Sequence, residues 1–479
     1  MALKDLREYI ELLEKNNCLK RVNQVVSPIL EIPEILRRVM YRKGPAVLFE
    51  NVQDYPEWHV VGNLFCSIEI LKKAFEVNRL EEIGERLVKP ALEPPSTNIT
   101  GKIKALGEMI GFGKFTPKKV RKGPVFEQEI DNPNLLKFPA FKSWPEDGGT
   151  YFTYPLVLTQ DPEKKITNLG VYRVMILDEK RGVIHWQIHK RGKMAFDKSS
   201  ELGKRMKVAI VLGGDPGLLL TGASPVPFPF DKLLFAGIIR GEGIEVIQID
   251  ELLVPARAEA VLIGYVDPDD LHHEGPFGDH FGYYDAPEDL YPVFHLERVF
   301  MRKDPIYFGS VVGLPPLEDA VIGKAIERIF LPLLKMLFPE IVEVNLPEYG
   351  MFHGLAIVSI KKRYPGHAKK VMMGLWGTGQ FSLTKTLVVV DEDVDPGNLN
   401  DVIFAVSANV DPQRDVVIIP YTHADVLDPS TKYPGFGSKM GIDATRKFRE
   451  ETGKDWPKMV KIDEETKKQI DEIWEKLGI

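Results

Sequence analysis

The chain has 479 residues, of which 44% are hydrophobic and 27% charged, a balance typical of a globular protein with several domains. Its net charge of −7 argues against a general nucleic-acid-binding surface, which requires an excess of basic residues. No apolar run is long enough to cross a bilayer, and residues 1–17 predict a charged amphipathic helix instead of a secretion signal. The two cysteines, Cys18 and Cys66, are too few for a disulfide framework or a zinc site. We therefore expect a cytoplasmic protein with no integral membrane segment and no nucleic-acid partner.

Residues 1–114 predict an N-terminal α/β domain, because helical periodicity alternates there with short apolar strands. The proline-rich segment 93–102 interrupts this pattern and predicts an edge of the domain. The predicted helices are 6–16, 31–42 and 67–77, and the predicted strands are 45–52 and 58–64.

Residues 115–312 predict a β-rich central domain, since strand-like runs recur with turns about every 10 residues. This spacing is typical of a barrel or a sandwich and not of a parallel sheet. The predicted strands are 154–161, 171–179, 183–189, 207–214, 243–250, 258–266 and 292–302.

Residues 313–450 return to an alternation of helices and strands, which predicts a C-terminal α/β domain that begins with a helix over 320–339. The tail, residues 451–479, predicts an amphipathic helix with Ile470, Ile473, Trp474 and Leu477 at helical spacing. A terminal helix of this kind commonly docks on a neighbouring subunit, so we expect a homodimer or a higher homo-oligomer.

Two strand-like segments of the central domain carry polar residues that suggest a site. Arg173 lies in an apolar strand and needs an anionic partner, either in a structural ion pair or in a functional site. His185, Gln187 and His189 alternate along the predicted strand 183–189 and would share one face, where two histidines are able to bind one metal ion.

The stretch HHEGPFGDHFGYYD, residues 272–285, combines a Gly-Pro-Phe-Gly turn with two acids, Glu274 and Asp279. One interpretation is a metal site formed by the acids and the three histidines, although adjacent histidines rarely point the same way. The other is acid–base chemistry: two carboxylates near an arginine have their pKa values driven apart, so that one stays ionised and one carries a proton. That pairing suits a reaction whose carbanion must be protonated.

Several common motifs are absent or out of context. RGEGIEV leads into a strand instead of opening a helix, so it does not form a dinucleotide-binding turn, and neither a phosphate-binding GxxxxGK[ST] loop nor a GxSxG elbow occurs. Asp231 follows a proline-rich loop and is placed to cap the helix that begins after it.

Taken together, the segments TNLGVYR, WQIHKRG, GASPVP, FAGIIRG, EGPFGDHFGYY, GHAKKVMMGLW, TKTLVVVDEDVDP and GFGSKMGIDAT resemble the UbiD family of decarboxylases, in order, from about residue 120 to about 450. The resemblance implies an α/β fold of three parts: an N-terminal α/β domain, a central split β-barrel like that of flavin reductases, and a C-terminal α/β domain. It also implies prenylated FMN, supplied by a separate flavin prenyltransferase, with manganese or magnesium and often potassium at the cofactor phosphate.

By this resemblance Arg173, Glu274 and Asp279 form the catalytic network for a non-oxidative, reversible decarboxylation. Asp279 would supply the proton that replaces carbon dioxide, while Glu274 and Arg173 would set its pKa and orient the leaving carboxylate. The Gly-Pro-Phe-Gly turn would fix the two acids relative to each other.

The resemblance also implies the cofactor and metal positions. The expected cofactor contacts are Asn168, His189, Ser224, Pro225 and Lys385, with Lys385 at the phosphate. The expected metal ligands are Asn168, His189 and Asp231. The family's third metal ligand is a glutamate, five residues before the glycine of FAG, and that position is Lys232 here. Either Asp231 replaces the glutamate and Lys232 turns outward, or Lys232 points into the cavity and binds an anion such as a substrate phosphate.

The substrate expected from the resemblance is a small α,β-unsaturated or aromatic carboxylic acid of isoprenoid or quinone precursor synthesis. The thermophile-like composition slightly favours anhydromevalonate phosphate over a 4-hydroxy-3-polyprenylbenzoate. Two further hypotheses remain at this point: a flavin- or metal-binding homologue without turnover, and a metal-dependent hydrolase built on the histidine cluster.

Overall fold

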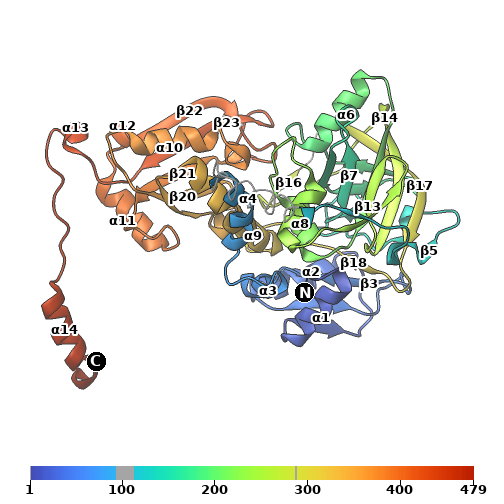
Figure 1. Cartoon of the computed structure of the whole chain (residues 1–479), viewed down its shortest axis with the longest axis horizontal. Coiled ribbons are helices and arrows are strands. Elements are labelled where there is room, and N and C mark those ends of the chain that lie inside the picture. The colour runs from blue at the N-terminus through green and yellow to red at the C-terminus, as the bar shows by residue number, and fades with distance from the viewer. Residues whose placement is uncertain (1, 93–112, 286–288) are drawn as a thin grey trace, which may run out of the picture.

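The computed structural model describes residues 2–92, 113–285 and 289–479, which fold into three domains followed by a separate terminal helix (Figure 1). The predicted domain edge at 93–102 lies outside these described residues. Cys18 and Cys66 are both free thiols, in keeping with the expected absence of a disulfide framework. Within the described ranges, no helix combines the length and the apolar character that crossing a bilayer requires.

The N-terminal domain is an α/β layer around a four-stranded sheet of order β1-β2-β3-β18. Its last strand, β18 (Ile306–Phe308), comes from far along the chain and pairs in parallel with β3. Helix α1 begins after Asp5, whose side chain accepts a hydrogen bond from the Glu8 backbone N–H, and it buries one apolar face. The other elements are β1 (Leu19–Val22), α2 (Glu31–Tyr41), β2 (Ala46–Phe49), β3 (His59–Gly62), α3 (Ile68–Ala74) and α4 (Glu81–Leu92), with α1 spanning Leu6–Lys15.

The central domain is a strongly curled antiparallel sheet of order β6-β9-β10-β17-β14-β11-β7-β8, with β5 paired to β17, as expected for a split barrel (Figure 1). The long strands β14 and β17 shift register between Ile263 and Gly264, and such a bulge increases the local twist that curls a sheet. Only glycine fits at 264, because a Cβ there would approach the His295 carbonyl oxygen to 2.0 Å. The strands are β5 (Gln128–Glu129), β6 (Tyr151–Phe152), β7 (Leu156–Gln160), β8 (Thr167–Val171), β9 (Val174–Ile176), β10 (Arg181–Ile184), β11 (Met206–Leu212), β14 (Ala260–His273) and β17 (Leu290–Met301).

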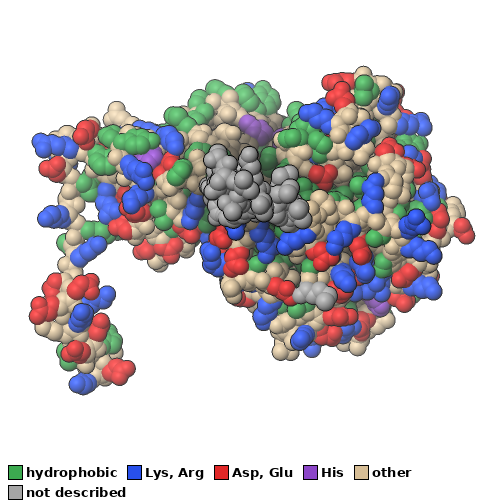
Figure 2. All heavy atoms as spheres, viewed as in Figure 1, with side chains coloured by type: hydrophobic (Ala, Val, Ile, Leu, Met, Phe, Trp, Pro, Cys, Tyr) green, Lys and Arg blue, Asp and Glu red, His purple; other side chains and the backbone are tan. Residues whose placement is uncertain are grey.

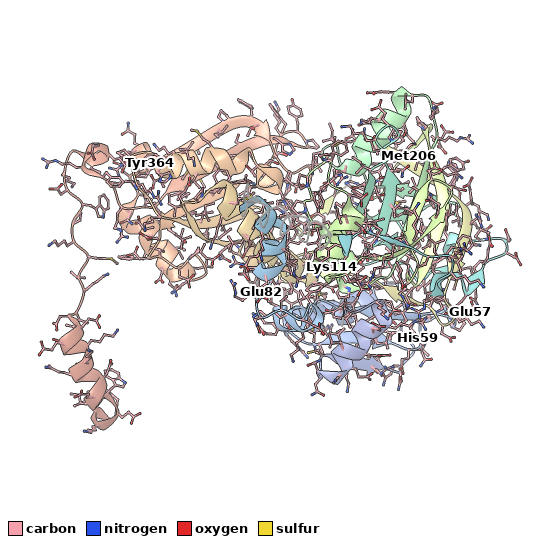
Figure 3. The ribbon with its side chains drawn as sticks, viewed as in Figure 1. Glu57, His59, Glu82, Lys114, Met206 and Tyr364 are labelled. Carbon is pink, nitrogen blue, oxygen red and sulfur yellow. The ribbon has the colours of Figure 1, made fainter. Side chains whose placement is uncertain are left out.

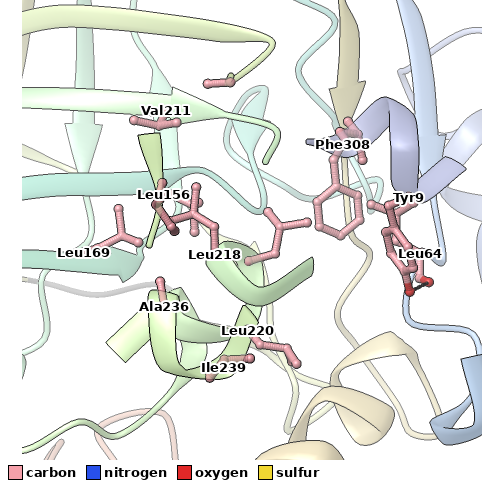
Figure 4. Packing of buried hydrophobic residues seen from close by; sticks show 14 of the residues in the cluster. Tyr9, Leu64, Leu156, Leu169, Val211, Leu218, Leu220, Ala236, Ile239 and Phe308 are labelled. Atoms are coloured by element: carbon pink, nitrogen blue, oxygen red, sulfur yellow. Dashed lines mark hydrogen bonds between the residues drawn. The ribbon is translucent and has the colours of Figure 1, made fainter. Parts of the chain in front are cut away.

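Two helices of the central domain, α7 (Pro216–Ala223) and α8 (Lys232–Arg240), pack on the β7, β8 and β11 side of the curled sheet. Figure 4 shows Leu218 of α7 between Leu156 of the sheet and Phe308 of the N-terminal domain, with Ala236 and Ile239 of α8 below them, and all belong to one buried cluster. One continuous core therefore joins these two domains. The remaining elements are α6 (Arg191–Glu201), the sheet of β4 (Lys118–Lys119), β12 (Glu245–Ile249) and β13 (Leu252–Pro255), and the pair β15 (Phe277–Gly278) and β16 (Tyr284–Asp285).

The C-terminal domain is a mixed five-stranded sheet of order β19-β20-β21-β23-β22 with helices on its faces, as the alternating pattern predicted. The long helix α9 (Glu318–Leu337) leads into it and also lies against α4 of the N-terminal domain. The strands are β19 (Ile341–Asn345), β20 (Leu355–Ile360), β21 (Thr386–Asp391), β22 (Val416–His423) and β23 (Phe436–Asp443), and the helices are α10 (His367–Trp376), α11 (Leu399–Asn409), α12 (Pro412–Asp415) and α13 (Arg449–Thr452).

The tail helix α14 (Glu464–Ile473) stands apart from the three domains, and Figure 3 shows its side chains extending into open space. None of its residues is buried. The apolar residues Ile470, Ile473, Trp474 and Leu477 are all exposed, so the amphipathic face predicted from the sequence has no partner within the described part of this chain.

Candidate active site

Arg173 and Glu274 form a buried bidentate ion pair at the centre of the site. Arg173 follows β8, and its Nε and Nη2 atoms each donate to a different Glu274 oxygen at 2.7 Å. The side chains are 8% and 0% exposed, respectively. The arginine fork matches the carboxylate geometry, and such charge-assisted pairs hold both groups in one orientation. The buried arginine therefore has the anionic partner that both of its interpretations required.

His185 and Asp285 complete this network; the sequence suggested only a shared metal-binding face for His185 and no role for Asp285. His185 Nδ1 donates to Glu274 Oε2 at 2.7 Å, and its ring stacks on Tyr291 with centroids 4.5 Å apart. Arg173 Nη2 also donates to Asp285 Oδ2 at 2.6 Å. The only prior sign of Asp285 was its place at the end of the loop 272–285, where β16 brings it back towards Arg173.

The expectation of one strand over 183–189 is wrong, and so is the shared histidine face. Strand β10 ends at Ile184, and the chain then turns towards α6, with the His185 backbone N–H donating to the Arg173 carbonyl at 3.1 Å. His185 consequently faces Glu274, whereas the ring of His189 lies 5.4 Å from that of His423 in the C-terminal domain. The two histidines do not share a metal ion because the turn separates their directions.

Burial and charge drive the pKa values of the two loop acids apart. Burial by itself raises the pKa of Glu274, but the charge of Arg173 and the contact with His185 outweigh it and lower the pKa to about 2. Asp279 has no arginine hydrogen bond of this kind. Its burial, with a further contribution from the Asp285 charge, raises the pKa to about 7, although the Phe281 N–H bond opposes the shift. Glu274 therefore remains a carboxylate, while Asp279 exchanges a proton near neutrality.

The Gly-Pro-Phe-Gly turn holds the two acids apart in a fixed arrangement. Gly278 has no room for a side chain, because a Cβ there would meet the Trp144 ring at 2.2 Å. The Phe277 ring lies 4.5 Å from the Arg173 guanidinium carbon, and the Asp279 Oδ1 atom accepts from the Phe281 N–H at 2.7 Å. The loop thus places each carboxyl group by backbone geometry as well as by charge.

No three of the loop residues considered as metal ligands come together in the part of the chain that the structure describes. His272 and His273 are exposed at the end of β14, and Glu274 is held by Arg173. His280 instead faces His353 and Asp425 of the C-terminal domain, with one donor atom of each residue within 4.8 Å of the others. His353 Nε2 donates to Asp425 Oδ2 at 2.7 Å, so this cluster connects the loop to the C-terminal domain. Figure 2 shows histidine at the surface between the central and C-terminal domains, whereas His353 of this cluster is buried.

A largely apolar cavity of about 440 Å³ lies beside this network, between the central domain and α9. That volume suits a flavin-sized ligand. His280, which follows Asp279 directly, lines the cavity, and so does Pro225, one of the expected cofactor contacts. Ser224 is buried next to it, and its hydroxyl donates to the Leu220 carbonyl at 2.8 Å. The loop containing Ser224 and Pro225 therefore forms one wall of the cavity.

Of the expected metal and phosphate contacts, Asn168 and His189 keep unsatisfied polar atoms, whereas Asp231 and Lys385 are already engaged. Asn168 keeps a buried Oδ1 without a hydrogen-bond partner among the described residues, as do both ring nitrogens of His189. Asp231 is engaged: Oδ1 accepts from the Leu233 and Leu234 N–H groups as the cap of α8, and Oδ2 accepts from the Thr167 N–H. Lys385 forms an ion pair with Asp428 at 2.9 Å and is 41% exposed.

Lys232 follows neither of the two courses considered from the sequence. It does not turn outward, because it is 5% exposed, and its Nζ does not enter the cavity to meet a substrate. The ammonium instead donates to the Ser224 and Thr221 carbonyl oxygens at 2.9 and 3.2 Å, at the end of α7. Burial, with the charges of Arg191 and Lys190, lowers the pKa of Lys232 to about 7.

Comparison with known sequences identifies three family models that together match most of the chain. These are the N-terminal, Rift-related and C-terminal domains of 3-octaprenyl-4-hydroxybenzoate carboxy-lyase, at residues 10–87, 118–315 and 320–444. An uncharacterised protein of Aeropyrum pernix is 54% identical, covering 99% of both chains, and one of Archaeoglobus fulgidus is 48% identical, covering 100% of this chain and 99% of the other.

Solved structures share the complete architecture. The closed form of vanillic acid decarboxylase from Sedimentibacter hydroxybenzoicus matches with a TM-score of 0.87 and 29% identity, over 100% of this chain and 99% of that one. The UbiD-class enzyme HmfF from Pelotomaculum thermopropionicum, in complex with FMN, matches with a TM-score of 0.79 and 27% identity, over 97% and 98%. An evolved dimeric form of HmfF in complex with prFMN matches with a TM-score of 0.77 and 26% identity over the same shares. Since all three domain models match in order and the likeness extends along the whole chain, this protein belongs to the UbiD family of carboxy-lyases.

Proposed function

We propose that this protein is a prenylated-FMN-dependent decarboxylase of a small α,β-unsaturated or aromatic carboxylic acid. The observation that carries the proposal is the pair of buried acids beside the cavity, one held ionised by Arg173 and one with a pKa of about 7. Bound HmfF structures, with FMN and with prFMN, support the choice of cofactor. When bound, the prenylated flavin supplies the electron sink that makes loss of carbon dioxide feasible.

The residues of this chain would then divide the remaining work. Arg173, fixed by Glu274 and Asp285, orients the substrate carboxylate at the mouth of the network. The carbon–carboxylate bond breaks and carbon dioxide leaves, and the Asp279 carboxyl proton is transferred to the same carbon. Water then restores the proton on Asp279. The apolar walls of the cavity exclude water while the carbanion character lasts.

Cofactor dependence is the first test of this function. Protein produced without a flavin prenyltransferase should be inactive, and activity should appear when the prenylated flavin is restored. Carbon dioxide release from a panel of acids measures this, and the panel should include anhydromevalonate phosphate and a 4-hydroxy-3-polyprenylbenzoate. Full activity of cofactor-free protein would end the proposal. A normal flavin spectrum with no turnover on any acid would favour the binding homologue without activity.

The pH dependence of kcat/KM should follow Asp279. Because the acid donates only while protonated, and its pKa is about 7, the rate should be level below neutrality and fall as the pH rises through about 7. The decline should approach about tenfold per pH unit, as expected for one essential acid. Glu274, with a pKa of about 2, stays ionised throughout and adds no second limb near neutrality. A profile that is flat across neutrality, with Asp279→Glu leaving it unchanged, would remove Asp279 from the role.

We also propose that the tail helix mediates assembly into a homodimer or a larger oligomer. Its exposed face of Ile470, Ile473, Trp474 and Leu477 needs an apolar partner, which a second subunit would provide. Light scattering tests this, because removing residues 451–479 should lower the solution mass to that of a smaller assembly. An unchanged mass would exclude the tail from the interface.

A further inference from the structure

Two histidines and one aspartate meet where the loop 272–285 contacts the C-terminal domain. His280 comes from that loop, His353 from the turn before β20, and Asp425 from the segment after β22. One donor atom of each residue lies within 4.8 Å of the others, and His353 Nε2 and Asp425 Oδ2 are 2.7 Å apart. We call these three residues the interdomain triad, because the packing of two domains brings them together.

Hydrogen bonding within the protein leaves two nitrogens of the interdomain triad unused. His280 Nε2 and His353 Nδ1 are buried and have no hydrogen-bond partner among the residues that the structure describes. Packing of the His280 ring against Phe281 and Phe352, with centroids 4.8 and 5.1 Å away, provides apolar contacts but no partner for its nitrogen. A buried polar atom without a partner is costly, so the arrangement favours a ligand that binds there.

The backbone fixes His353 and Asp425 in the orientation that ligands of one ion require. Asp425 Oδ1 accepts from the Leu427 N–H at 3.0 Å, which turns Oδ2 towards His353. Met351 and Phe352, directly before His353, both have left-handed backbone conformations, with φ values of 54° and 43°. Neither is glycine, and strain of this kind persists where the surrounding structure enforces it, commonly at functional sites. The turn therefore holds His353 in place against its own preference.

The donor atoms and their spacing suit a divalent transition metal. Zinc binds imidazole nitrogen and carboxylate oxygen at about 2.0–2.2 Å, so two of its ligands lie up to about 4 Å apart. His353 and Asp425 already satisfy this limit, and a small rotation of the His280 ring would bring the third donor within it. Two imidazoles with one carboxylate favour zinc over magnesium or calcium, which prefer oxygen ligands. Because His280 and His353 line the cavity, the remaining coordination positions of the ion would face it.

A second group of possible ligands shows why the interdomain triad is the better metal site. His185, Glu274 and Asp285 also have donor atoms within 4.8 Å of one another, but Arg173 donates to both acids and supplies the positive charge there. Within the described ranges, no lysine or arginine forms a salt bridge with the interdomain triad, although the Lys190 charge acts on its aspartate from a distance. A metal ion would therefore displace no side-chain cation from the triad.

We propose that the interdomain triad binds one zinc ion, or a similar divalent transition metal, and that the ion joins the loop 272–285 to the C-terminal domain. No flavin or substrate supplies a ligand, so the inference does not rest on the proposed function. The site shares no ligand with the set expected beside the cofactor phosphate, which is Asn168, His189 and Asp231. The ion fixes the loop at the residue that directly follows the proposed proton donor.

Zinc binding by the flavin-free, full-length protein tests this inference. After metal removal with EDTA and dialysis, calorimetric titration with zinc should show one site per chain. Asp425→Asn keeps the shape of the side chain and should weaken zinc binding by at least about 100-fold, since even the partners of metal ligands typically contribute about 10–100-fold. A wild-type protein that binds no zinc, or an Asp425→Asn variant that binds it normally, would overturn the inference.

Two control variants exclude zinc bound elsewhere on the chain. His295→Gln removes a histidine that also contacts an aspartate, Asp270, at 2.7 Å, but that forms no group of three ligands in the described ranges. It should bind zinc as wild type does. Asn168→Ala changes the expected cofactor-metal position and should also leave zinc affinity unchanged. If Asn168→Ala abolishes zinc binding, the ion belongs to the cofactor site and the inference fails.

Hydrogen exchange distinguishes an ion that joins the two domains from an ion held by the C-terminal domain alone. Saturating zinc should slow amide exchange in the loop 272–285 of wild type, because the loop must release its ligand to open. His280→Asn should lose this protection even where zinc still binds weakly to the other two ligands. Unchanged loop exchange in zinc-bound wild type would refute the connection between the domains. Each of these failures leaves the flavin-dependent decarboxylase standing, since cofactor dependence tests that function separately.

Discussion

Replacing Asp279 with asparagine is expected to lower turnover by about 10²–10⁴-fold, the usual effect of removing a general acid. The amide has nearly the same shape, and its Oδ1 can still accept the 2.7 Å hydrogen bond from the Phe281 N–H. Fold and flavin binding should therefore be preserved, while no carboxyl proton remains to replace carbon dioxide. Single-turnover kinetics with the prenylated flavin bound would measure the loss at the chemical step.

A second buried acid provides the matched control for this variant. Glu318 is 1% exposed, and burial raises its pKa to about 7, although hydrogen bonds from the Phe65 N–H and the Ser310 hydroxyl oppose the shift. Glu318→Gln removes a comparable titrating group outside the Arg173 network and should keep most of the turnover. Equal losses of turnover in the two variants would mean that removing any buried acid impairs the protein, and that Asp279 is not the specific proton donor.

Stability offers a readout of Asp279 that does not depend on activity. An acid whose pKa is raised by folding binds its proton more tightly in the folded state. Its ionisation therefore costs stability as the pH rises from about 4, the pKa of the acid in the unfolded chain, to about 7, its pKa in the folded protein. The free energy of unfolding of Asp279→Asn, relative to that of wild type, should therefore be lowest at low pH and should rise through this pH window. Parallel unfolding curves for both proteins at every pH would contradict the raised pKa.

Replacing Arg173 with alanine is expected to be at least as damaging to turnover as the loss of Asp279, and to destabilise the fold as well. Glu274, fully buried, would lose its bidentate partner and keep only His185. Breaking a buried ion pair by removing one partner typically costs about 3–5 kcal/mol. Denaturant unfolding should show this loss. Without the arginine the pKa of Glu274 rises, so that Glu274 is protonated at low pH and is an unpaired buried charge at high pH. The loss of stability should therefore be larger at high pH than at low pH.

A double variant distinguishes the structural part of this effect from the chemical part. Arg173→Ala with Glu274→Gln leaves no uncompensated carboxylate at position 274, so much of the stability should return. Turnover should not return, because no guanidinium remains to orient the substrate carboxylate. Recovery of turnover in the double variant would show that Arg173 acts only by holding Glu274.

Much of the architecture follows from local patterns that survive in the folded chain. The apolar runs at 207–214 and 258–266 become β11 and β14, and the helix expected at 320–339 becomes α9, because periodicity depends only on neighbouring residues. The prediction failed at 183–189, where β10 ends at Ile184. There the alternation of polar and apolar residues continued, but the Trp186 N–H bonds to the Ile184 carbonyl at 3.0 Å, and the backbone leaves the strand in a turn.

The active site depends on contacts that no local pattern contains. Arg173 and Glu274 are 101 residues apart, and His353 and Asp425 are 72 apart. The order β9-β10-β17-β14 of the curled sheet brings the first pair together, and the docking of the C-terminal domain brings the second pair to His280. The resemblance named the proposed catalytic residues, but the partners His185 and Asp285 emerged only when the sheet and the loop were in place.

The amino-acid sequence by itself determined the order of helices and strands, the turn that holds Glu274 and Asp279, and the presence of a lysine where a metal ligand was expected. Only the tertiary structure decided which acid carries a proton and where the lysine charge goes. The reason is that pKa values and ion pairing depend on burial and on groups brought close from distant segments. Asp279 is raised to about 7 chiefly by burial, and Lys232 is directed to carbonyl oxygens by the packing of α7 against α8. Both outcomes depend on how the surrounding elements pack around Asp279 and Lys232, and the local residue pattern does not show that packing.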